Sequence, residues 1–158
     1  MFTKVCAALA VLVVSTAGTI AHAQSYRLNQ PLADDPDTIL QEVAITPERT
    51  TVTIVLRNSS KRDTIEACAH PSHKPEAFML KDLDSGKVWK QEGSTGLVSC
   101  ENGMDEIRPG KRKTLKVQFP SLPATARRLQ IGENNCQQKP DDDMDYWCFS
   151  EVVLNQKK

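Results

Sequence analysis

Hydrophobic and polar residues alternate along most of this chain with a period of two. The clearest example is segment 51–56, where Val52, Ile54 and Leu56 fall on one face of an extended chain. This alternation, together with the enrichment in β-branched residues, predicts a β-strand that is buried on that face. The polar, turn-forming residues 58–60 end the strand.

Shorter stretches of the same kind predict further strands, each bounded by residues that favour turns. They are 40–45, 64–69, 77–82, 87–90, part of 93–100, 115–119, 129–131 and 147–154. Asp84-Ser85-Gly86 predicts a hairpin between two of them. Since no stretch of convincing length has the helical period, the sequence predicts an all-β fold, an antiparallel β-sandwich of about seven to eight strands.

The order of turns and strands in the middle of the chain carries a resemblance to a known class of domains. A hairpin at 84–87 is followed by an Arg-Pro-Gly turn at 108–110, the strand 115–120 and the segment Leu-x-Ile-Gly-Glu at 129–133. In this order the chain from about Leu40 to Glu133 resembles bacterial exported domains of immunoglobulin-like fold. The resemblance implies an immunoglobulin-like sandwich and a binding role, and it brings no catalytic residues.

The first 23 residues are typical of a secretory signal peptide. Lys4 supplies a positive charge, Val5–Val14 are apolar, and residues 21–23 (Ala-His-Ala) have the small-x-small form of a cleavage site. An apolar run of this length is too short to span a bilayer, which needs about 20 residues, and no lipobox surrounds Cys6. We therefore expect residues 1–23 to be removed and the mature protein to be exported, periplasmic or secreted, and not lipid-anchored.

The remaining residues predict one domain with a short extension. Residues 24–39 are rich in Asp and Pro with little periodicity, which predicts an extended N-terminal arm, and residues 40–158 have the length of a single β-sandwich domain. The formal net charge of the chain is zero, which argues against nucleic acid as a partner because nucleic-acid-binding domains usually present a strongly basic face. No second apolar run approaches the length of a membrane span.

Four cysteines follow the signal peptide, and an even number in an exported chain predicts two disulfides. Four cysteines permit three pairings. We favour Cys68–Cys100 and Cys136–Cys148 because each bond closes a local loop. The chain contains no Cys-x-x-Cys pair, so the sequence gives a thioredoxin-type redox role no support.

A loop with two histidines is the nearest approach to a metal site. Cys68, His70 and His73 lie within six residues and are the side-chain types that zinc and copper prefer. The mature chain has no third histidine, and a zinc site would leave one cysteine unpaired. We expect an exposed loop beside a disulfide, with His70 and His73 as the only candidate metal ligands and with no cofactor.

An acidic segment lies inside the second predicted disulfide loop. The spacing of its aspartates matches the start of an EF-hand calcium loop, but Tyr146 replaces the required glycine. Acidic residues next to aromatic ones combine electrostatic steering with the side chains that anchor protein interfaces. The alternative is that Trp147 turns inward at the start of the last strand. The predicted partner-binding residues are Asp141, Asp142, Asp143, Asp145, Tyr146 and Trp147.

A basic stretch follows the predicted turn at 108–110. Its members are Arg108, Lys111, Arg112, Lys113 and Lys116. Such a stretch could meet an anionic surface, or it could be the solvated face of a strand.

The sequence does not support an enzymatic function, since the chain has neither a nucleophile elbow nor a phosphate-binding glycine loop. The sequence predicts a non-enzymatic exported binding protein with a protein partner, most specifically a periplasmic inhibitor or immunity-type protein that blocks a secreted hydrolase or toxin. One alternative is an accessory protein of an envelope, pilus or secretion complex that binds through a sheet edge. The other is a periplasmic metal-binding protein.

Overall fold

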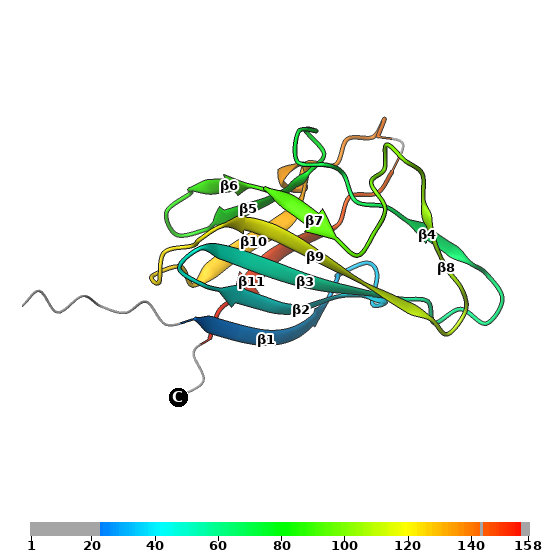
Figure 1. Ribbon diagram of the computed structural model, residues 1–158, viewed down its shortest axis with the longest axis horizontal. Helices are drawn as coiled ribbons and strands as arrows, with labels where there is room; N and C mark the ends of the chain where they lie inside the picture. Colours follow the sequence, from blue (N-terminus) through cyan, green and yellow to red (C-terminus); the bar gives the residue numbers. More distant parts are fainter. Residues whose placement is uncertain (1–22, 143, 156–158) are drawn as a thin grey trace, which may run out of the picture.

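The computed structural model describes residues 23–142 and 144–155. In these residues the chain forms eleven β-strands and one short helical turn, and every pairing between strands is antiparallel (Figure 1). The predicted all-β antiparallel fold is therefore confirmed. The elements are β1 (Gln24–Pro31), β2 (Thr38–Ile45), β3 (Arg49–Arg57), β4 (Ile65–Ala67), β5 (Phe78–Asp82), β6 (Val88–Lys90), β7 (Gly93–Thr95), β8 (Asp105–Ile107), β9 (Arg112–Pro120), β10 (Arg128–Glu133), η1 (Asn134–Cys136) and β11 (Cys148–Val153).

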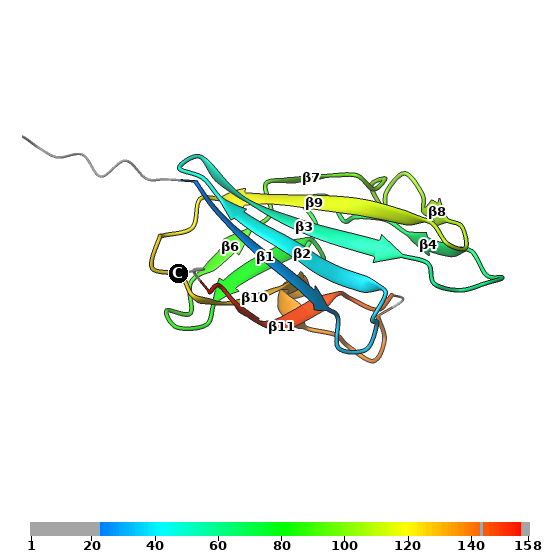
Figure 2. The ribbon, with the colours of Figure 1, turned by 90° about the horizontal axis from the view of Figure 1, so that it is seen from below.

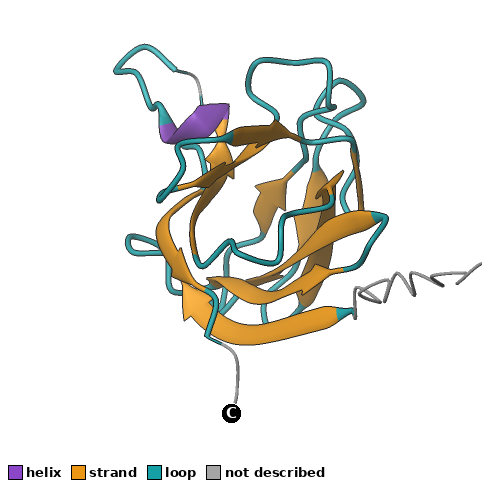
Figure 3. Cartoon of the chain, turned by 90° about the vertical axis from the view of Figure 1, so that its left-hand side faces the viewer, coloured by secondary structure: helices purple, strands orange, loops and turns teal. Residues whose placement is uncertain are grey.

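The strands form two large sheets and one small ribbon. The five-stranded sheet has the order β1-β2-β3-β9-β7, the four-stranded sheet has the order β11-β10-β5-β6, and β4 pairs only with β8. The two large sheets enclose the interior between them, as in a sandwich (Figure 3). The β4–β8 ribbon extends one end of the molecule beyond them (Figure 2).

The pairing of β3 with β9 explains why the period-two pattern predicts this fold. Ile54 lies opposite Leu115 and Val52 lies opposite Val117, and all four side chains are fully buried. Because successive side chains of a strand point to opposite faces, this register places one alternate set of residues on the inner face of the sheet.

Both large sheets contribute aromatic side chains to one core. Phe119 comes from the five-stranded sheet, Phe78 and Phe149 come from the four-stranded sheet, and none of the three is more than 2% exposed. Burial of apolar surface contributes about 25 cal/mol per Å², so this shared core is what holds the two sheets together.

Two glycines are needed where the backbone turns or approaches another strand. Gly86 has φ +74° and its N–H donates to the carbonyl oxygen of Asp82 at 2.8 Å, which closes the predicted β5–β6 hairpin. Gly96 has φ +101°, and a Cβ there would lie 1.9 Å from the carbonyl oxygen of Thr114. A side chain at position 96 would therefore force the segment after β7 away from β9.

The structure has more strands than the seven to eight predicted. Residues 24–31 of the expected N-terminal arm are extended, and they pair with β2 as edge strand β1. The three-residue strand β8 is also additional, because three residues are too few to show a period of two. Strands β4 and β7 are equally short, but they lie within the predicted strands 64–69 and 93–100. The predicted signal peptide lies outside the described residues, apart from Ala23.

Both predicted disulfides are confirmed. The Cα atoms of Cys68 and Cys100 are 4.9 Å apart, and those of Cys136 and Cys148 are 5.2 Å apart.

Among the residues that the structure describes, no helix is long and apolar enough to cross a membrane.

Candidate binding site at the loop pole

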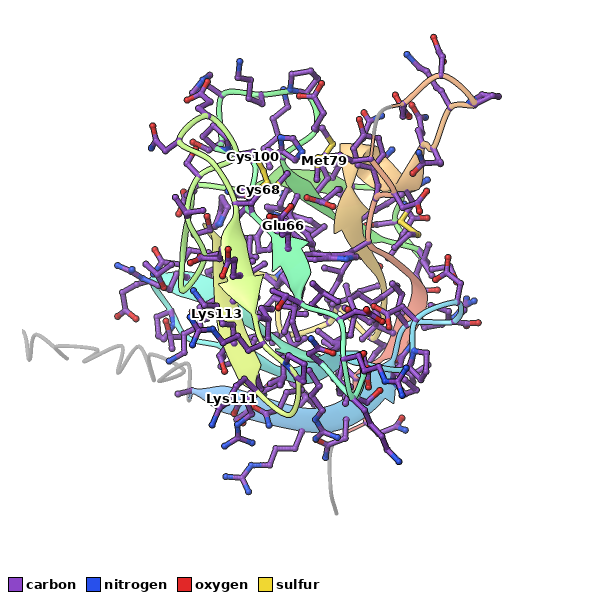
Figure 4. The ribbon with its side chains drawn as sticks, turned by 90° about the vertical axis from the view of Figure 1, so that its right-hand side faces the viewer. Glu66, Cys68, Met79, Cys100, Lys111 and Lys113 are labelled. Carbon is purple, nitrogen blue, oxygen red and sulfur yellow. A yellow bond between two sulfur atoms is a disulfide. The ribbon has the colours of Figure 1, made fainter. Side chains whose placement is uncertain are left out.

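Two loops meet at one end of the molecule, and each is fastened by a disulfide. Residues 134–147 connect β10 to β11 and are closed by Cys136–Cys148, while residues 68–77 precede β5 and are fastened by Cys68–Cys100 (Figure 4). We call the end formed by residues 68–77 and 134–147 the loop pole. The longer loop projects beyond the sheets (Figure 1).

The longer loop begins with a left-handed turn. Asn134, Asn135 and Cys136 have φ angles of +46°, +52° and +59°. This conformation costs about 1 kcal/mol or more per residue, and asparagine tolerates it better than most residues. The turn is held by the disulfide at Cys136 and by the amide of Gln130, which donates to the carbonyl oxygen of Asn135 at 3.1 Å.

Beyond this turn, one glutamine braces the two sides of the loop. The Gln138 side chain accepts from the N–H of Tyr146 at 2.8 Å and donates to the carbonyl oxygen of Met144 at 3.0 Å. Closer to the tip, the N–H of Lys139 donates to the Asp142 carboxylate at 2.6 Å. The loop is thus fixed by its own side chains in addition to its disulfide.

The structure separates the predicted binding residues by exposure. Asp141 and Asp145 are exposed, Asp142 and Tyr146 are half-buried, and Asp143 lies outside the described residues. These positions place carboxylates next to a phenol at the surface of the loop pole.

Trp147 differs from the other predicted binding residues because it packs against the core. It is half-buried, and its ring centroid lies 6.1 Å from that of Phe78. The structure thus gives Trp147 a packing role, and its part in partner binding stays a prediction.

The structure brings the histidine loop and the acidic loop together. The rings of His70 and Tyr146 meet in a T-shaped arrangement, with centroids 6.4 Å apart and an interplanar angle of 75°. Behind this contact, the buried side chain of Gln91 donates to the carbonyl oxygen of His70 and accepts from the N–H of Phe78, both at 3.0 Å. Sequence reasoning missed Gln91, because a lone glutamine between two short strands belongs to no motif.

Burial favours the uncharged forms of both His70 and Tyr146. Burial raises the pKa of the Tyr146 phenol, and the carboxylates of Asp142, Glu76 and Glu133 raise it further. Burial also lowers the pKa of His70, partly opposed by Glu76.

Glu133 is a second residue that the sequence did not reveal. Its side chain is only 5% exposed, and its carboxylate accepts from the N–H of Trp147 at 3.1 Å. Burial raises the pKa of Glu133 to about 7, although the hydrogen bond from Trp147 opposes this rise. The sequence did not reveal this burial, because a glutamate at the end of a strand is ordinarily expected on the surface.

The two candidate metal ligands have different neighbours. His70 faces Tyr146, whereas the Nε2 of exposed His73 lies 3.1 Å from a carboxylate oxygen of Glu101. Cys68 is committed to its disulfide. Within residues 23–142 and 144–155, no group of three or more His, Cys, Asp or Glu side chains is placed to hold a metal ion.

Comparison with models of protein families, with curated proteins and with solved structures gives no match to this chain. The resemblance to immunoglobulin-like exported domains stays a prediction.

Proposed function

We propose that this protein is a non-enzymatic exported binding protein that recognises another protein through the loop pole. In its most specific form, the proposal is that the protein is an inhibitor or immunity-type protein that blocks a secreted hydrolase or toxin. The observation that carries the proposal is a disulfide-closed, internally braced loop that presents exposed Asp141 and Asp145 beside Tyr146. The two disulfides are compatible with export, because they persist in oxidising compartments.

The rigidity of the loop supports a role in binding. A segment already fixed in one conformation loses little conformational entropy when a partner binds, so more of the contact energy appears as affinity. Tyr146 has the large amphipathic side chain that often anchors an interface, and the surrounding carboxylates would steer a partner with a basic cleft. A projecting acidic loop of this kind could enter and block such a cleft.

The test compares partner capture by three forms of the mature protein. The loop variant is Asp141→Asn/Asp145→Asn, since both carboxylates are exposed and neither makes a side-chain hydrogen bond within the described residues. The matched control is Glu48→Gln/Glu92→Gln, which removes two exposed carboxylates elsewhere. Each form is used to capture proteins from the host's exported fraction, and the captured proteins are identified and assayed for hydrolase or toxin activity.

We expect the wild type and the control to capture one stoichiometric hydrolase or toxin and to inhibit it. The loop variant should bind that partner about tenfold more weakly, because a charged contact in an interface contributes on the order of 1–3 kcal/mol. Equal affinity of the loop variant and the control would contradict the proposal. So would a captured partner whose activity is unchanged.

A groove at the open side of the sandwich favours a second candidate, an accessory protein of an envelope, pilus or secretion complex. Edge strands β1 and β11 lie beside each other and border a groove of about 730 Å³, in which Val153 is 41% exposed. An extended segment of a partner could add to such an edge. Capture of envelope components by the wild type and their loss with Val153→Lys would support this candidate over the first.

A further inference from the structure

Two turns lie next to each other at a second end of the molecule, and hydrogen bonds of Asn58 connect them. The turns are 58–64, between β3 and β4, and 108–111, between β8 and β9. The buried side chain of Asn58 donates to the carbonyl oxygens of Asp63 and Ile107, both at 2.7 Å. The backbones also pair, since the Asn58 N–H donates to the oxygen of Lys111 at 2.9 Å and the Gly110 N–H donates to the oxygen of Asn58 at 2.8 Å. We call this end the turn pole.

The turn pole holds arginines side by side. Arg57 and Arg112 are directly opposite each other in the β3–β9 register, and both are exposed. With Lys111 they line a pocket of about 460 Å³, whose other walls are Asn58, Ser59 and Gly110. Figure 4 shows Lys111 on the side of the molecule away from the Cys68–Cys100 disulfide, so this pocket is remote from the loop pole.

None of these three cations forms an ion pair with another described residue. In the part of the chain that the structure describes, no carboxylate oxygen lies within 4.0 Å of a side-chain nitrogen of Arg57, Lys111 or Arg112. The pKa of the neighbouring Asp37 is lowered, mainly by hydrogen bonds from the hydroxyl and the N–H of Ser59 and to a lesser extent by Arg57. The Asp37 carboxylate therefore keeps its negative charge while Ser59 holds it, and it attracts Arg57 without forming an ion pair with it.

Like charges directly opposite each other across two strands destabilise a sheet. The paired arginines therefore repel each other, Asp37 offsets only part of this repulsion at Arg57, and an external anion would relieve the rest. Guanidinium groups match sulfate and phosphate oxygens with two parallel hydrogen bonds, and the pairing of β3 with β9 fixes the backbones of both arginines next to each other. Further cations on the same two turns could meet neighbouring anionic groups of a longer ligand. They are Lys61, Arg62 and Arg108.

We propose that the pocket at the turn pole binds sulfate or phosphate groups of an anionic glycan. Among the described residues, neither turn carries a large exposed hydrophobic side chain, whereas proteins that lie on membranes usually insert such side chains. The spread of cations over two turns also exceeds what one free anion needs. This binding goes beyond the proposed function, because it would hold the exported protein at a glycan-bearing surface while the loop pole stays available.

The test is calorimetric titration of the mature protein with a sulfated heparin oligosaccharide at low salt. The pocket variant is Arg57→Gln/Arg112→Gln. The matched control is Arg27→Gln/Lys90→Gln, which removes two exposed cations of β1 and β6 outside the pocket. We expect the pocket variant to bind about tenfold more weakly or worse, because charge-assisted hydrogen bonds contribute on the order of 1.5–3 kcal/mol each. The control should keep the wild-type affinity, and added salt should weaken binding by the wild type.

The proposal would be overturned if the wild type did not bind the oligosaccharide. It would also be overturned if the pocket variant and the control lost affinity equally, or if inorganic sulfate alone bound as tightly. Binding to anionic phosphatidylglycerol vesicles without binding to the oligosaccharide would also overturn it, in favour of a lipid surface. Thermal unfolding of each variant separates a lost site from a lost fold, and the single variant Lys111→Gln, on an exposed turn, provides a milder second test.

Discussion

The two large sheets and the loop pole keep their shapes by different means. The sheets rest on strand register and on a shared apolar core, in which residues such as Ile54 and Leu115 are fully buried. The longer loop of the loop pole has no regular strand in its described residues 137–142 and 144–147. It depends on a disulfide, a left-handed turn and hydrogen bonds from glutamine side chains. A loop held in this way can change its residues with little effect on the sheets, which is what a recognition surface requires.

The first way to test this difference is to damage the sheets alone. Leu115→Ala should lower the free energy of unfolding by about 2–5 kcal/mol, because it removes a fully buried side chain and leaves a cavity. Lys116→Ala is the control, since Lys116 is the exposed next residue of β9. Denaturant unfolding followed by tryptophan fluorescence measures both changes.

The control should change the free energy of unfolding by less than about 0.5 kcal/mol. Partner binding and glycan binding should both persist in Leu115→Ala under conditions where it stays folded. If Leu115→Ala were as mild as Lys116→Ala, the account of the core would be wrong.

The sheets could be predicted from the sequence more fully than the loop pole, because the two regions are stabilised by different kinds of contact. Strands such as 51–56 and 115–119 follow from their alternation, because burial on one face of a sheet imposes a period of two. The two disulfide pairings follow from loop closure and are confirmed. These features depend on residues that are near one another in sequence or repeat regularly along it.

The contacts of the loop pole could not be predicted in this way. The pairing of His70 with Tyr146 and the support from Gln91 join residues from distant parts of the chain. The burial of Glu133 depends on how Trp147 folds back over the end of β10. No local pattern encodes such contacts, because they arise only when the sheets have already placed the loops together.

The second test removes the covalent support of the longer loop. Cys136→Ser/Cys148→Ser should lower the free energy of unfolding by about 3 kcal/mol, on the estimate of loop-closure entropy for a bond that spans 12 residues. The left-handed turn at 134–136 should open, because the bond that helps to hold it is lost. Hydrogen exchange measured by mass spectrometry should therefore speed up in peptides from the loop pole.

Peptides from β3 and β9 should keep their slow exchange in this variant under native conditions. Partner capture through the loop pole should weaken, whereas glycan binding at the turn pole should not. Uniformly faster exchange in the sheets would show that loop and sheets unfold as one unit, contrary to the difference described above.

The smallest expected effect concerns the buried carboxyl group of Glu133. Its pKa is raised from 4.5 in the unfolded chain to about 7 in the folded protein, because burial disfavours its charged form. The folded protein therefore binds a proton more tightly than the unfolded chain, and stability from this group is fully present below pH 4.5 and is lost as the pH rises through about 7. The loss should be on the order of 2 kcal/mol between pH 5 and pH 8.

Glu133→Gln isolates this contribution, because the amide keeps an acceptor for the N–H of Trp147 and does not titrate. Urea unfolding at a series of pH values should show the variant gaining stability relative to the wild type as the pH rises. The gain should level off above pH 7, where Glu133 is charged in both states. Glu106→Gln, at an exposed position of β8, is the matched control and should show no such trend. A constant difference between Glu133→Gln and the wild type at every pH would mean that burial of Glu133 does not couple the loop pole to protonation.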